Sequence, residues 1–265
     1  MCLIAIAWRT HPECPLALVA NRDELHARPA AAAAYDPDAD TVYGGRDLVQ
    51  GGGWLQVSTT GRLAAVTNVR TGLRAEPAPR SRGWLVRDFV RDDGTAEAFA
   101  ASLQETGGEY GAFNLLAFDG DALRFASNRP RPGHAPVAPG LHAMSNGAFD
   151  AAWPKSTLAT RALQAWLASG HALADPMARP DALEPLFAAL ADTTEAPDAA
   201  LPDTGVGLAL ERALSPPFVS DATYGTRCST VVLARPGGFV FAERRFGPAA
   251  RVLGTSVEFV PRSRG

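Results

Sequence analysis

The sequence predicts an α+β domain in which two antiparallel β-sheets pack face to face and helices cover their outer sides. Strand-like segments come first along the 265 residues, helical segments concentrate in the middle, and strands return at the end. Several strand segments are apolar on both faces, which an antiparallel strand requires only where both sides of its sheet are covered. No internal repeat or linker divides the chain, so residues 1–265 are expected to form a single domain.

The expected strands are short apolar runs bounded by turn residues, and most of them pair as hairpins. The hairpins are residues 2–8 with 16–20, 54–58 with 62–70, 113–118 with 122–128, and 229–234 with 239–246. Residues 141–146 form a further strand, and residues 256–260 form one at a sheet edge. The strand at 16–20 is expected to end at Asn21, and residues 30–53 and 130–140 are expected to be mostly loop.

Helical periodicity marks four segments, at residues 81–90, 95–103, 154–169 and 180–191. Pro154 suits the first position of the third helix, and Gly170 suits its end. Residues 192–205 are rich in Pro, Asp and Thr and are expected to form a loop.

Composition narrows the class of protein. The net charge is −3 and there is no basic block, so no nucleic-acid partner is expected. No apolar run is long enough to span a bilayer, and the first residues lack the basic start and cleavage site of a signal peptide. The three cysteines have neither disulfide nor metal-site spacing, which favours a cytoplasmic location and no bound metal. Lys155 is the only lysine among the 25 basic residues.

Cys2 directly follows the initiator methionine. A small second residue favours methionine removal, which would leave one residue with both a thiol and a free α-amine. Their ordinary pKa values, near ~8.5 and ~8, are close enough for the amine to act as the base of its own nucleophile. The alternative is a small buried hydrophobe in the first strand.

A charged tetrapeptide, Asn21 to Glu24, follows the second strand. Arg22 could lower the pKa of a thiol or bind a carboxylate, and either Asp23 or Glu24 could orient an α-ammonium group. Asn68 and Asn146 also lie at expected strand ends, where side-chain N–H groups suit an oxyanion hole. The alternative for each is a turn residue.

Arg227 enters the last hairpin where the chain turns apolar. A buried guanidinium needs a partner, which Asp23 or Glu24 could supply. The cleft arginines Arg22, Arg70 and Arg227 suit a substrate carboxylate or phosphate.

Taken together, the motifs resemble the NRDE family, which takes its name from the tetrapeptide and includes an animal transport and Golgi organisation protein. The resemblance rests on stretches that occur in order along nearly the whole chain: MCLIAIAW, HPECPLALVANRDELHARP, GGRDLVQGGGWLQVSTTGRLAAVTNVR, SRGWLV, MSNGAFDAAWPK and YGTRCSTVVL. It implies the four-layer αββα sandwich of N-terminal nucleophile hydrolases. It also implies a cysteine amidohydrolase-like activity on carbon–nitrogen or thioester bonds of a small amide or acyl compound.

The resemblance to the choloylglycine and penicillin V acylase group assigns roles to individual residues. Cys2 is the nucleophile and supplies the amine base, Arg22 and Asp23 orient and polarise the thiol, and Arg227 pairs with Asp23 or with substrate. Asn68 and Asn146 donate to the oxyanion. The hydrolases separate their Arg and Asp by two residues, so both Asp23 and Glu24 stay open here. The residues expected to contact substrate are Asn21, Glu24, Arg70 and Trp54.

The family also implies an alternative, a non-catalytic carrier of haem or of an acyl-CoA-like lipid in the same cleft. No cofactor is then required, and haem is cargo. Cys14-Pro15 is a dipeptide of the kind found in haem-regulated proteins, and His11 lies three residues before it. Cys14 is therefore either an axial ligand or a cysteine of a surface loop.

Overall fold

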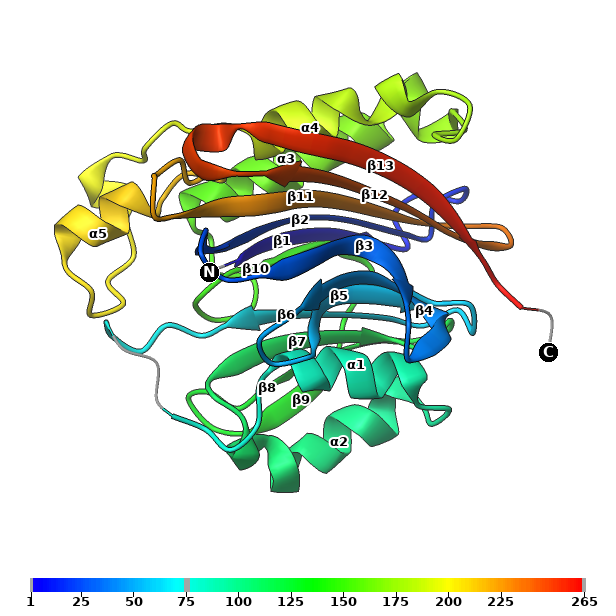
Figure 1. Cartoon of the computed structure of the whole chain (residues 1–265), viewed down its shortest axis with the longest axis horizontal. Coiled ribbons are helices and arrows are strands. Elements are labelled where there is room, and N and C mark those ends of the chain that lie inside the picture. Colours follow the sequence, from blue (N-terminus) through cyan, green and yellow to red (C-terminus); the bar gives the residue numbers. More distant parts are fainter. Residues whose placement is uncertain (1, 74–76, 264–265) are drawn as a thin grey trace.

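The computed structural model describes residues 2–73 and 77–263, except for the side chain of Cys2. Two antiparallel sheets lie face to face (Figure 1). Sheet A has six strands in the order β10-β1-β2-β11-β12-β13. They are β1 (Cys2–Trp8), β2 (Leu16–Leu25), β10 (Gly140–Met144), β11 (Tyr224–Arg235), β12 (Gly238–Phe246) and β13 (Val252–Pro261).

Sheet B has seven strands in sequence order from β3 to β9. They are β3 (Ala30–Asp36), β4 (Ala39–Asp47), β5 (Gly53–Ser58), β6 (Leu63–Asn68), β7 (Phe113–Phe118), β8 (Leu123–Ser127) and β9 (Gly133–Pro136). Every neighbouring pair is antiparallel, which confirms the hairpins expected at β5–β6, β7–β8 and β11–β12.

Helices cover the outer face of each sheet, so the chain forms four layers, as the sequence predicts (Figure 1). On sheet B lie α1 (Gly83–Arg91) and α2 (Ala96–Thr106), and on sheet A lie α3 (Pro154–Leu167) and α4 (Glu184–Leu190). A short helix, α5 (Leu208–Ala213), lies at one end of the sandwich. Single 3₁₀ turns occupy Gly107–Glu109, Gly170–Leu173, Pro180–Leu183, Asp198–Ala200 and Pro248–Ala250.

The strands are apolar on both faces because each sheet is covered twice. On β1, Ile4 and Ile6 belong to the core between the sheets, whereas Leu3 and Ala5 belong to the core under α3 and α4. A third core joins sheet B to α1 and α2. Since residues two apart share a face, one apolar strand serves two cores at once.

The structure differs from the sequence prediction in four segments. Residues 30–53 are mostly sheet, because β3 and β4 form a hairpin there, and residues 130–140 contain β9. β2 does not end at Asn21 but continues to Leu25, since β11 pairs with it as far as Leu25. Pro154 occupies the first turn of α3 as expected, but that helix ends before Gly170, which instead begins a 3₁₀ turn.

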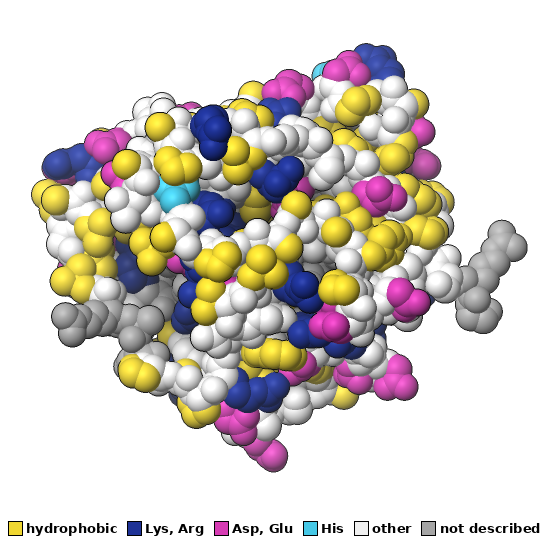
Figure 2. All heavy atoms as spheres, viewed as in Figure 1, with side chains coloured by type: hydrophobic (Ala, Val, Ile, Leu, Met, Phe, Trp, Pro, Cys, Tyr) yellow, Lys and Arg dark blue, Asp and Glu magenta, His cyan; other side chains and the backbone are white. Residues whose placement is uncertain are grey.

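Among the described residues, no helix combines the length and apolar character that crossing a membrane would need. Figure 2 shows basic side chains in several separate groups on one face, between apolar and acidic ones.

Candidate active site

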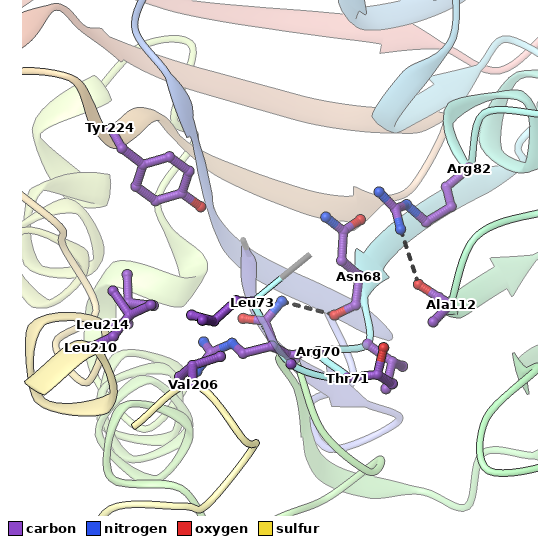
Figure 3. Close-up of a pocket in the computed structure, with 13 residues that line it drawn as sticks. Asn68, Arg70, Thr71, Leu73, Arg82, Ala112, Val206, Leu210, Leu214 and Tyr224 are labelled. Carbon is purple, nitrogen blue, oxygen red and sulfur yellow. Dashed lines mark hydrogen bonds between the residues drawn. The ribbon is translucent and has the colours of Figure 1, made fainter. Parts of the chain in front are cut away.

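A cleft of about 240 Å³ lies where strands of both sheets end. Asn68, Arg70 and Asn146, all singled out in the sequence, contribute to its lining together with Arg82 and Tyr224. Figure 3 shows the amide of Asn68 standing between Tyr224 and Arg82. The structure therefore brings together residues from distant parts of the chain at one end of the sandwich.

An apolar pocket of about 570 Å³ adjoins this cleft. The two share Leu210, Leu214 and Tyr224, and the apolar pocket adds Phe218 and Val219. A ligand with a polar group and an apolar body would find both environments side by side.

Hydrogen bonds join the two sheets at the floor of the cleft. Thr67 Oγ1 donates to the carbonyl oxygen of Ser145 at 2.6 Å, and Asn146 Nδ2 donates to the carbonyl oxygen of Asn68 at 2.8 Å (Figure 3). The Arg70 amide donates back to the carbonyl oxygen of Asn146 at 2.8 Å. These bonds fix the ends of β6 and β10 relative to each other.

The side-chain amides of Asn68 and Asn146 differ in how many of their hydrogen-bonding groups already have partners in the protein. Ser145 Oγ approaches Asn146 Oδ1 at 3.4 Å and Nδ2 donates to Asn68, so the Asn146 amide is oriented with one N–H left over. The Asn68 side chain has no hydrogen-bond partner within the described part of the chain, and it lines the cleft. Both can offer an N–H to an oxygen that develops charge.

The backbone of Cys2 lies at the same end of sheet A. Its Cα pairs with that of Arg22 on β2, and on the other side Ile4 pairs with Met144, two residues before Asn146. Cys2 thus begins β1 between β2, which carries Arg22, and β10, which ends two residues before Asn146. Its thiol lies outside the described residues, as does Met1.

The tetrapeptide Asn21 to Glu24 is divided between the two faces of β2, because it is strand rather than turn. Asn21 faces the helices: its Nδ2 donates to the carbonyl oxygens of Leu190 and Pro217, both at 2.8 Å, and its Oδ1 accepts from Ser229 at 2.6 Å. Asn21 therefore anchors two loops to the sheet, on the side away from Arg22.

Asp23 is buried next to Lys155, the only lysine of the chain. Burial raises the pKa of Asp23, while the Lys155 ammonium and a 2.7 Å hydrogen bond from Thr226 oppose that rise. Lys155 Nζ donates to the carbonyl oxygen of Leu214 at 3.0 Å, which ties it to the wall of the cleft. Glu24 is more exposed and lies 3.8 Å from Arg22.

Arg22 points the other way, into the space between the sheets. Its guanidinium carbon lies 4.4 Å from the ring centroid of Trp54, an arrangement typical of a cation–π contact. Trp54 stands directly over Gly45, where an added Cβ would come within 2.0 Å of the indole. Glycine at 45 is thus what lets Trp54 cover Arg22.

Arg227 and Arg70 use their guanidinium groups within the fold. Arg227 Nη1 donates to the carbonyl oxygens of Leu25 and Arg28, at 2.8 and 3.0 Å, rather than to the expected carboxylates. Arg70 forms a buried ion pair with Glu211 of α5 at 2.8 Å, and burial lowers the pKa of Arg70. Both arginines hold segments that border the site.

The sequence prediction missed three polar residues of this region, of which Thr226 and Glu243 are buried and Tyr224 is partly exposed. Tyr224 and Thr226 stand in the same motif as Arg227, and Tyr224 Oη donates to the carbonyl oxygen of Asp23 at 3.2 Å. Glu243 lies between the sheets because it alternates in step with Phe239 and Phe241, both core residues. This alternation, with a period of two residues, is the sequence signal that could have placed Glu243 between the sheets.

Cys14 is buried rather than exposed in a surface loop, and its thiol donates to the carbonyl oxygen of Leu16 at 3.4 Å. Burial raises the pKa of the Cys14 thiol to about 11. Because a metal ligand must be a thiolate, this environment disfavours axial ligation of haem by Cys14.

Comparison with known sequences finds relatives over nearly the full length. The family model described as Transport and Golgi organisation 2 matches residues 1–248. The Transport and Golgi organization 2 homolog of Mus musculus is 30% identical over 264 residues, covering 92% of each chain. The homolog of Bos taurus is 32% identical over 266 residues, again covering 92% of each chain.

Solved structures with the same fold are hydrolases by name. A Caenorhabditis elegans N-acylethanolamine-hydrolyzing acid amidase ortholog has a TM-score of 0.51 at 10% identity, covering 87% of this chain and 92% of its own. The C2A mutant of conjugated bile acid hydrolase from Clostridium perfringens has a TM-score of 0.52 at 6% identity, covering 98% and 92%. At these identities the likeness concerns the fold, which is that of N-terminal nucleophile hydrolases.

Proposed function

The chain belongs to the Transport and Golgi organisation 2 family, and on that premise we propose that it is a cysteine N-terminal nucleophile hydrolase of a small amide or thioester. One observation carries the proposal. The Cα of Cys2 lies opposite Arg22 at the end of sheet A where Asn146 and Asn68 meet across the two sheets. The two hydrolase structures of the same fold support it.

The chemistry follows from a free α-amine on Cys2. Once Met1 is removed, the amine takes the thiol proton and the thiolate attacks the substrate carbonyl carbon. The N–H groups of Asn68 and Asn146 stabilise the negative oxygen of the tetrahedral intermediate. The leaving amine or thiol departs with the proton, and a water activated by the same α-amine then releases the acid from the acyl-cysteine.

Arg22 and Asp23 prepare the nucleophile from opposite faces of β2. Arg22 is buried and pairs with Cys2 across the two strands, and a guanidinium near a thiol favours the thiolate because it stabilises the negative form. Asp23 provides a negative charge on the other face, where it can orient an ammonium group. Tyr224 joins the two halves of the site, since it borders the cleft and contacts the backbone of Asp23.

The Asn68 amide gives a first prediction. Asn68→Ala is expected to lower kcat by about 10²- to 10³-fold through loss of one oxyanion donor. Its unfolding free energy should change little, because the side chain makes no hydrogen bond within the described residues. Steady-state kinetics and urea denaturation measure the two quantities.

Asn21→Ala is the matched comparison, because it deletes the same amide from the other side of the site. It is expected to cost about 2–4 kcal/mol of stability, since it leaves two carbonyl oxygens and the Ser229 hydroxyl without their partner. If Asn68→Ala lost as much stability as Asn21→Ala, or kept full turnover, the oxyanion role of Asn68 would be wrong.

A second function, carriage of an apolar ligand, is favoured by the pocket of about 570 Å³ beside the cleft. Titration with acyl-CoA or haem should then show saturable binding, seen for haem as a Soret shift. Leu210→Glu, at the border of the two pockets, should weaken it at least about tenfold, because binding would have to bury a carboxylate. Absence of binding by both ligands would remove this function.

A further inference from the structure

A third cavity, of about 70 Å³, lies between the two sheets, where residues of β2, β3, β5, β11 and β12 line it. Its lining includes Arg22, Trp54, Arg227, Cys228, Glu243 and Arg245. We call it the arginine cavity. Its volume is several times the ~10–15 Å³ that one water needs, so a ligand of a few heavy atoms has room.

Strand register places this cavity beside the proposed nucleophile. Cys2 pairs with Arg22, Arg22 pairs with Cys228, and Cys228 pairs with Arg245. The four positions form one row across β1, β2, β11 and β12. Neighbouring strands lie about 4.8 Å apart, so the arginine cavity begins one strand away from Cys2.

Buried N–H groups without partners concentrate around this cavity. Arg22 Nη1, Trp54 Nε1 and Arg227 Nε are all buried and lack a hydrogen-bond acceptor among the described residues, against one buried acceptor of the same lining without a donor, Glu243 Oε2. The Arg22 residue as a whole is 7% exposed. A buried donor without an acceptor is costly, and several in one cavity indicate a ligand that supplies acceptors.

The charges around the cavity favour an anion. Three arginines face one carboxylate, Glu243, which is 1% exposed and accepts from the Ala33 amide at 2.8 Å. Burial raises the pKa of Glu243, although Arg245, Cys228 and Arg22 oppose the rise. Burial and the nearby Arg22 both lower the pKa of Arg227, as expected for cations held close together.

We propose that the arginine cavity is a binding site for a small carboxylate group, held by the guanidinium of Arg22, the indole N–H of Trp54 and the positive charges of Arg227 and Arg245. A carboxylate is planar, offers acceptors to several donors at once and matches guanidinium geometry. Because the site requires no turnover, the inference goes beyond the proposed hydrolase.

Binding to the full chain tests the proposal. Sodium formate or sodium acetate is added in place of an equal concentration of sodium gluconate, so that the ionic strength stays constant. Gluconate serves as the control anion because it is too large for the cavity. We expect a saturable rise in the melting temperature and saturable heat in calorimetric titration. A flat response to both ions would overturn the proposal.

Arg244 and Arg245 provide a matched pair of variants, because they are neighbours on opposite faces of β12. Arg244 is ion-paired with Glu184 on the helix side, at 2.7 Å, while Arg245 lines the cavity. Arg245→Gln should weaken formate binding at least about tenfold, whereas Arg244→Gln should not alter it. Equal weakening by both, as a non-specific charge effect would produce, would also overturn the proposal.

A succinate titration identifies the source of the carboxylate. Binding of succinate comparable to that of acetate would support a site for the acidic end of a longer molecule. Binding of formate and acetate alone would support a site for a free small anion. Since the readout is binding, failure of this site and failure of the hydrolase proposal are separate results.

Discussion

Cys2→Ala is expected to abolish hydrolysis, with a loss of at least about 10³-fold in kcat, because no other group can replace the attacking thiolate. The free energy of unfolding should change little, since Cys2 is the first residue of its strand and the change removes a single sulfur atom. The measurement is turnover of acyl amides and acyl thioesters that carry chromogenic leaving groups. Full turnover by Cys2→Ala would exclude Cys2 as the nucleophile.

Intact mass gives the same proposal a second, direct test. Protein from a host with normal methionine processing should lack one methionine, which exposes the α-amine of Cys2. An acid quench during turnover should then trap the acyl-cysteine, so that the N-terminal peptide is heavier by the mass of one acyl group. Retention of Met1 in most molecules would leave the amine in a peptide bond and contradict the mechanism.

Cys14→Ala is the matched control for the nucleophile. Cys14 precedes β2 at the end opposite Arg22, roughly 25 Å away at about 3.3 Å per residue. Its substitution should leave turnover per folded molecule unchanged, although loss of a buried thiol should lower stability. A loss of turnover equal to that of Cys2→Ala would mean that the effect is not specific to position 2.

The fold was largely predictable because strands that are apolar on both faces require covered sheets. β1 shows this most clearly, with Ile4 and Ile6 on one core and Leu3 and Ala5 on another. The β3–β4 hairpin was not predictable, because its Ala, Asp and Gly residues have low strand propensity. It forms against partners elsewhere in the chain, including Glu243, which holds the Ala33 amide.

The positions of the site residues were predictable to a lesser extent than their identities. Asn68 and Asn146 do meet at strand ends, as the motifs indicate. The tetrapeptide could not be divided between two faces from sequence, because four polar residues in a row are typical of a turn. The partner of Arg70 could not be predicted either, because Glu211 lies 141 residues away along the chain.

Apart from the loss of turnover in Cys2→Ala, the largest expected effect is the loss of stability when Lys155 is replaced. It is 3% exposed, and Asp23, at 2% exposed, is the carboxylate whose charge it balances. Lys155→Met should cost about 3–5 kcal/mol at neutral pH, because it leaves a buried carboxylate without its cation. Urea denaturation at pH 7 measures the loss.

Asp23→Asn combined with Lys155→Met distinguishes this pair from a simple loss of packing. If the two charges stabilise each other, the double variant should be more stable than the sum of the single costs predicts, by about 0.5–3 kcal/mol. Costs that simply add would show that Lys155 and Asp23 act independently. Asp23 would then need another cation to explain its burial.

The pH dependence of the Lys155→Met deficit follows from the sign of the Asp23 shift. A carboxyl whose folded pKa is raised by burial binds more protons when folded, so stability falls as pH rises from the unfolded value of about 3.8 towards the folded pKa. Removing the Lys155 ammonium raises that folded pKa further and extends the fall to higher pH. The deficit should therefore be largest at neutral pH, shrink as the pH falls through the raised folded pKa of Asp23, and be smallest near pH 4, where Asp23 is mostly protonated in the folded protein. A deficit that stayed constant from pH 4 to pH 7 would mean that Lys155 stabilises the fold through its contact with Leu214 and not through Asp23.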